Sequence, residues 1–286
     1  MKVIDRSAQI FEVYENGIFD LEKWKRYADR YVPGARELCL KDVEDCIKDA
    51  GLSWEKDYLP VLNELAEDPS KAEKAVRAFR AVTEHLEERI LKRFKRSVDA
   101  DVILYLGLCN GAGWVTALEG KTTVLLGIEK ITELNWCDIN SMNGLIIHEL
   151  GHAYQSQYGT LTLETGSVPD RFLWQLFTEG VAMVFEQEVI GDPEYFHQDV
   201  HGWKNWCDRH AEKIRDSFDR DLKTMTPAEQ RYFGDWVSFE GYGDTGYYLG
   251  TRFVRFLMRS DDFDDIIRYD IARVRQGYDR FLQAAL

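Results

Sequence analysis

Two histidines and a glutamate lie close together in the stretch GLIIHELGHAYQ, residues 144–155. His148 and His152 are four residues apart, and Glu149 directly follows the first of them. Residues four apart on a helix are neighbours, so both imidazoles would be placed to bind one tetrahedral metal ion. Glu149, about 100° round the helix, would then face a water molecule beside that ion. The competing interpretation is a packed helix on which two histidines are neighbours by chance, and spacing alone does not decide between them.

A third candidate ligand lies on a later apolar segment, DRFLWQLFTEGVAMVFEQEVIG, residues 170–191. Glu179 is three or four positions from Leu176, Ala182 and Met183, so a helix would place its carboxylate on an apolar face. An unpaired carboxylate is costly there, and a metal ion would offset this cost, as would an arginine or a helix N-terminus. Two histidines and one glutamate would leave a fourth zinc position open for water, as in catalytic zinc sites.

The elements that must position these residues are two helices. The first has an apolar face and a glycine, Gly151, between its histidines; glycine costs about 1 kcal/mol relative to alanine in a helix, which suggests that another backbone or a substrate approaches closely. Its capping candidates are Asp138, Asn140 and Ser141. The second helix is expected to begin at Pro169 and Asp170 and to end at Gly191.

The rest of the chain predicts an α+β fold in which helix dominates. Residues 20–97 indicate several helices, the longest from about Ser70 to Lys95. A near-continuous apolar run at residues 101–109 and two β-prone stretches separated by Glu119 and Gly120 predict a small sheet with a hairpin. We therefore expect an N-terminal helical subdomain, residues 1–98, and a second domain, residues 99–286.

The two metal-helix segments resemble those of a known enzyme family. IIHELGHAYQ followed by FTEGVAMVFEQ is similar to the gluzincin metallopeptidases, and GYYLGTRFV (residues 246–254) is similar to a segment of poorly characterised predicted zinc-dependent proteases. The resemblance covers about residues 101–258 and implies a zincin-like core. It also implies one zinc ion (Zn2+) per chain on His148, His152 and Glu179, with Glu149 as the general base that activates water. The implied activity is hydrolysis of peptide bonds in a peptide or protein substrate.

Other segments could complete such a site. A tyrosine near the C-terminal side often stabilises the oxyanion in this family, and Tyr247 and Tyr248 are the candidates here, with ordinary packing as the equal alternative for each. Helical spacing places Tyr248 on one face with Arg252, Arg255 and Arg259. The stretch NGAGWV, residues 110–115, would be either the edge strand that holds an extended peptide or a plain hairpin strand.

A second histidine pair, His197 and His201, has the same spacing. No glutamate follows its first histidine, so we interpret this stretch as a surface helix and not as a second metal site.

Composition restricts the partners and the compartment. The 286 residues carry 36 Lys and Arg against 50 Asp and Glu, a formal net charge of −14, which argues against nucleic acid as a partner. The acidic N-terminal stretch does not resemble a secretory signal, and no apolar run reaches membrane-spanning length, so the protein is expected to be cytoplasmic. Five cysteines without a Cys-x-x-Cys pair are expected to be buried free thiols.

Two alternative functions remain open. One is a non-catalytic zinc-binding pseudoprotease whose helical part recognises a partner. The other, a two-histidine-one-carboxylate iron site, gives Glu149 no evident use.

Overall fold

The computed structural model describes residues 1–285, leaving aside the side chain of residue 50. The chain divides into two compact units, Met1–Ala153 and Tyr154–Leu286. The boundary lies within one continuous helix, α7 (Ile139–Tyr158). This division differs from the boundary expected near residue 98, because the N-terminal residues form a strand in the same sheet as residues 101–127.

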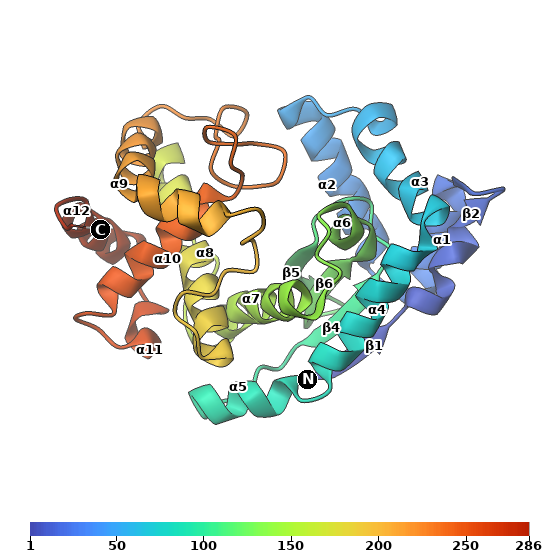
Figure 1. Ribbon diagram of the computed structural model, residues 1–286, viewed down its shortest axis with the longest axis horizontal. Helices are drawn as coiled ribbons and strands as arrows, with labels where there is room; N and C mark the ends of the chain where they lie inside the picture. The colour runs from blue at the N-terminus through green and yellow to red at the C-terminus, as the bar shows by residue number, and fades with distance from the viewer. Residues whose placement is uncertain (286) are drawn as a thin grey trace. The chain divides into compact units, whose positions relative to one another are not determined.

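The sheet of the first unit has four strands in the order β1-β4-β6-β5, drawn in Figure 1. The strands are β1 (Lys2–Asp5), β4 (Asp101–Tyr105), β5 (Gly113–Leu118) and β6 (Lys121–Gly127). β4 pairs in parallel with both β1 and β6, whereas β5 and β6 form an antiparallel hairpin. Glu119 and Gly120 form its turn, both with positive φ, as two-residue hairpin loops require. The hairpin is therefore confirmed, and β5 lies at one end of the sheet.

Helices make up most of the remaining first unit. They are a 3-10 helix (Ser7–Val13), α1 (Leu21–Tyr31), α2 (Ala35–Ala50), a π-helical turn (Trp54–Tyr58), α3 (Leu59–Glu67), α4 (Pro69–Thr83), α5 (Leu86–Phe94) and α6 (Ile128–Glu133). A short two-stranded ribbon joins β2 (Tyr14–Glu15) to β3 (Ile18–Phe19). Figure 1 shows α4 beside β1, and the Arg80 side chain on α4 binds the Asp5 carboxylate of that strand.

The prediction of a single long helix at residues 70–95 is wrong, because this segment forms two helices, α4 and α5. The chain leaves helical geometry at His85, whose φ is −125°, and two helices result. The Thr83 hydroxyl donates to the Phe79 carbonyl at 2.8 Å in the last turn of α4. Leu86 and Ile90 are buried like Phe79, so the apolar repeat continues across a break that periodicity does not reveal.

Helix α7 begins where its capping residues predict. The Asp138 carboxylate accepts from the backbone N–H groups of Asn140 at 2.8 Å and Ser141 at 3.1 Å. These bonds satisfy donors that lack a partner inside the helix.

The second unit is built from helices, with α7 entering it as residues 154–158. The others are α8 (Val168–Ile190), α9 (Trp203–Leu222, kinked at His210), α10 (Thr245–Leu257), α11 (Phe263–Ile266) and α12 (Ile271–Leu282). Ser167 caps α8 by accepting from the Asp170 N–H, and Gly191 ends it in the left-handed conformation. The predicted limits of this helix are confirmed.

The fold class is confirmed as a helix-dominated α+β structure with a small mixed sheet. All five cysteines are free; Cys39, Cys137 and Cys207 are buried, whereas Cys46 and Cys109 are half-buried. Among residues 1–285, no helix combines the length and apolar character needed to cross a membrane.

Candidate metal centre

The two predicted histidine ligands lie side by side on α7 in the first unit. The ring centroids of His148 and His152 are 4.9 Å apart, with the ring planes at 88°. His148 is 3% exposed and His152 is half-buried. Two imidazoles at this separation, sheltered from bulk water, suit one small divalent ion with nitrogen ligands.

Glu149 packs against the edge strand of the sheet in the same unit. Its side chain is 6% exposed and lies over Gly113, the first residue of β5. A Cβ atom at position 113 would be 2.7 Å from Glu149 Cγ and 2.8 Å from Oε1. Glycine is therefore the residue that lets β5 approach the carboxylate without displacing it. The stretch around Gly113 was expected to be either a peptide-holding edge strand or a plain hairpin strand, and neither interpretation included this contact with Glu149.

A buried glutamate that sequence analysis missed holds the loop before β5. Glu129, near the start of α6, accepts from the N–H of Gly107 through Oε2 and from the N–H of Cys109 through Oε1, each at 3.0 Å. A Cβ atom at Gly127 would be 2.9 Å from Oε1, so the carboxylate fills space left by glycine. Burial raises the pKa of Glu129 to about 7, although the backbone donors act in the opposite direction. No local pattern marks this residue, since its partners lie 20 and 22 positions away.

In the second unit, Glu179 lies on α8 at a close helix crossing. Its side chain is half-buried, while its helix neighbours Leu176, Ala182 and Met183 are fully buried. The next residue, Gly180, meets Gly250 of α10: a Cβ atom at 180 would be 2.2 Å from the Gly250 carbonyl oxygen. Figure 1 shows these two helices together. Because residue 180 is glycine, the backbones of α8 and α10 can come into contact where the two helices cross. Glu179 is the residue next to this crossing.

The two candidate tyrosines of α10 have different environments. Tyr248 is 2% exposed, and its hydroxyl donates to Asp208 Oδ1 at 2.9 Å. Burial raises its pKa, so this hydroxyl stays protonated as a donor to Asp208. Tyr247 is half-buried and stands three residues before Gly250, within one turn of the crossing with α8. Its backbone carbonyl accepts from the Thr251 hydroxyl at 2.7 Å.

The segment around His197 is not the surface helix that was expected. Residues 192–202 contain no helix, and His201 has a left-handed backbone with φ of 52°. His197 is 5% exposed, and its Nδ1 is 2.9 Å from the fully buried Glu186 carboxylate on α8. The similarity of spacing to a helical pair was misleading because His197 bonds across the fold to a residue 11 positions earlier.

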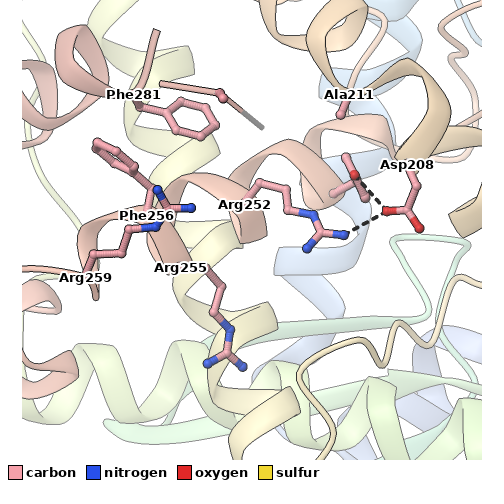
Figure 2. Close-up of a pocket in the computed structure, with 9 residues that line it drawn as sticks. Asp208, Ala211, Arg252, Arg255, Phe256, Arg259 and Phe281 are labelled. Carbon is pink, nitrogen blue, oxygen red and sulfur yellow. Dashed lines mark hydrogen bonds and ion pairs between the residues drawn. The ribbon is translucent and has the colours of Figure 1, made fainter. Parts of the chain in front are cut away.

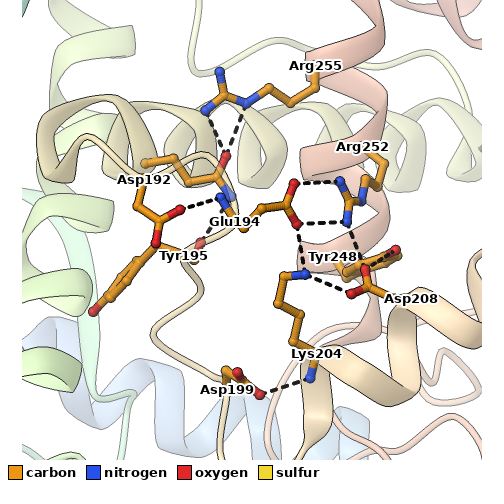
Figure 3. A network of polar contacts seen from close by, with 10 residues as sticks. Asp192, Glu194, Tyr195, Asp199, Lys204, Asp208, Tyr248, Arg252 and Arg255 are labelled. Atoms are coloured by element: carbon orange, nitrogen blue, oxygen red, sulfur yellow. Dashed lines mark hydrogen bonds and ion pairs between the residues drawn. The ribbon is translucent and has the colours of Figure 1, made fainter.

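A chain of ion pairs holds the segment that carries His197 (Figure 3). The Glu194 carboxylate lies 2.8 Å from the Lys204 ammonium and 3.3 Å from the Arg252 guanidinium. Lys204 and Arg252 also bind Asp208, at 2.7 and 2.8 Å. Burial alone would raise the pKa of the Asp208 carboxyl. The hydrogen bonds from Lys204, Tyr248 and Arg252 outweigh this effect and hold the pKa below its ordinary value. The network ties the segment to α9 and α10.

Comparison of the chain with protein-family models, with curated proteins and with solved structures gave no match.

Proposed function

We propose that this protein is a zinc-dependent peptidase with a zincin-like catalytic core. His148, His152 and Glu179 are the ligands of one zinc ion per chain, and Glu149 is the general base. The observation that carries the proposal is the imidazole pair of α7, 4.9 Å between centroids, with the Glu149 carboxylate next in the chain and packed under the sheet edge.

The donor set fits zinc. Two imidazoles and one carboxylate are the ligands of open, catalytic zinc sites, and His148, His152 and Glu179 form one of two residue groups in the described chain that could hold a metal ion. The other group consists of His148, Glu186 and His197. Glu186 and His197 already bind each other at 2.9 Å, which favours Glu179 as the carboxylate ligand. Bound zinc would polarise the scissile carbonyl and lower the pKa of a water molecule.

The chain itself would supply the proton transfer and the positioning. Glu149 would take a proton from the attacking water and later deliver it to the leaving amine. Gly113 keeps β5 in contact with that carboxylate, and the outer side of β5 offers main-chain groups to an extended peptide. Tyr247 would donate to the developing oxyanion, a role for which Tyr248 is less suited because its hydroxyl donates to Asp208.

The central experiment compares wild type with Glu149→Gln and His152→Ala. Zinc content is measured by elemental analysis after reconstitution, and hydrolysis is followed with fluorescence-quenched casein. We expect Glu149→Gln to keep one zinc per chain and lose at least about a hundredfold in rate, and His152→Ala to lose both. Wild-type activity in Glu149→Gln would refute the role of the base, whereas a zinc-loaded but inactive wild type would support the pseudoprotease alternative.

Two matched pairs of variants test the other assignments. Glu179→Gln should release zinc, whereas Glu186→Gln should retain it; the reverse result would move the carboxylate ligand to Glu186. Tyr247→Phe should lower kcat by about 10²–10³-fold with zinc retained, whereas Tyr248→Phe should leave kcat within a few-fold of wild type. Equal effects of the two tyrosine variants would remove Tyr247 from the site.

A further inference from the structure

The second unit contains a cavity of about 330 Å³ beside α10 and the turn that follows it. Tyr248, Arg252 and Arg255 line it from one face of α10, and Arg259 lines it from the turn that follows the helix. Figure 2 shows Arg252 with Asp208 on one side, and Phe256, Arg259 and Phe281 together on the other. Three guanidinium groups around one cavity stand out in a chain whose net charge is −14.

Two of the three arginines already bind carboxylates. Arg252 contacts Asp208 and Glu194, and Arg255 turns toward α8, where it binds Glu188 and the Gln187 side-chain oxygen. Their charges are therefore largely matched inside the protein. They build the wall of the cavity and leave little hydrogen-bonding capacity for a ligand.

Arg259 differs from both. Within residues 1–285 it takes part in no ion pair, and its guanidinium lies over the Phe256 ring, 5.4 Å from the centroid. The side chain is exposed and lines the cavity, so its donors are open to solvent. Stacking on an aromatic ring holds a guanidinium in one plane and leaves its edge donors available for a bidentate anion.

The wall beneath Arg259 is aromatic. Phe256 and Phe281 lie 5.6 Å apart between centroids and both line the cavity. Phe256 is only half-buried, so part of an apolar surface remains open beside an unmatched positive charge. Sites for small ligands commonly combine an apolar wall of this kind with one or a few oriented polar groups.

We propose that this cavity binds a small organic anion, a carboxylate or a phosphate monoester attached to an apolar group. Arg259 receives the anionic oxygens, and Phe256 and Phe281 contact the apolar group. The site uses residues of the second unit alone and does not depend on the proposed zinc site.

Calorimetric titration of the full chain with phenyl phosphate, phenylacetate and inorganic phosphate tests this site. We expect at least one of the two phenyl anions to bind one per chain, and the tighter of the two identifies the anionic group. Inorganic phosphate should bind more weakly than phenyl phosphate, because it makes no contact with the rings. Arg259→Gln should weaken binding of the phenyl anion at least about tenfold, since charge-assisted bidentate hydrogen bonds are lost.

The control is Arg273→Gln. Arg273 is also exposed and stacked on an aromatic ring, Tyr269, with 4.0 Å between guanidinium and centroid, but it does not line the cavity. This variant should bind like wild type. Equal binding by wild type and Arg259→Gln would overturn the proposal and point to attachment elsewhere, including on a metal ion. Absence of binding by both phenyl anions, or equal loss in both arginine variants, would also overturn it.

Discussion

Replacing Glu129 with glutamine should change how the stability of the protein depends on pH. The carboxylate is fully buried and accepts from two backbone N–H groups, those of Gly107 and Cys109. Tyrosine side chains near it, Tyr27 and Tyr105, are neutral in the physiological range and do not offset its charge. Glutamine keeps the size of the side chain but does not titrate, so the variant isolates the ionisation.

The size of the effect follows from the pKa. Burial raises the pKa of the Glu129 carboxyl from the ordinary 4.5 to about 7 in the folded protein. A group whose pKa is higher when folded contributes stability that is fully present below the unfolded pKa and is lost as pH rises through the folded pKa. At about 1.4 kcal/mol per pKa unit, the folded protein should lose about 3 kcal/mol relative to the glutamine variant between pH 4.5 and about pH 7.

The assay is urea unfolding of wild type and Glu129→Gln at several pH values between about 4 and 8. The difference in free energy of unfolding removes the contributions of all other titrating groups. Replacing the exposed Glu88 in the same way controls for the loss of one negative charge. A difference that stays constant with pH, or that favours wild type increasingly as pH rises, would refute the reasoning.

Three further predictions concern close contacts and a helix cap. Gly113→Ala should displace the Glu149 carboxylate and lower the proposed peptidase activity by at least about tenfold, with the proposed zinc ion retained; unchanged activity would show that the contact is not needed. Gly180→Ala should destabilise the second unit by about 1–3 kcal/mol or more in urea unfolding, since its Cβ would overlap the Gly250 carbonyl; an unchanged midpoint would contradict that crossing. Asp138→Ala should cost about 1 kcal/mol in the same assay through loss of the α7 cap, and a neutral result would assign the start of α7 to packing.

The sequence by itself determined the features that depend on neighbours along the chain. Side-by-side placement of His148 and His152 follows from helical spacing, and the structure confirms it. The cap at Asp138 and the hairpin turn at Glu119 and Gly120 are equally local, and both were predicted. Each involves a bond or backbone conformation within a few residues, so residue type and spacing carry enough information.

Only the tertiary structure decided the contacts between distant segments. β1 pairs with a strand about 100 residues later, which no early pattern indicates. His197 is buried where its imidazole contacts the Glu186 carboxylate of α8. Gly180 contacts Gly250 because α8 and α10 cross at these two residues. Spacing predicted that Arg252, Arg255 and Arg259 lie on one face with Tyr248, but it did not show that Arg252 and Arg255 pair with carboxylates while Arg259 pairs with none among residues 1–285. These contacts and ion pairs depend on which distant segments pack against each other. The local conformational preferences of the chain do not determine that packing.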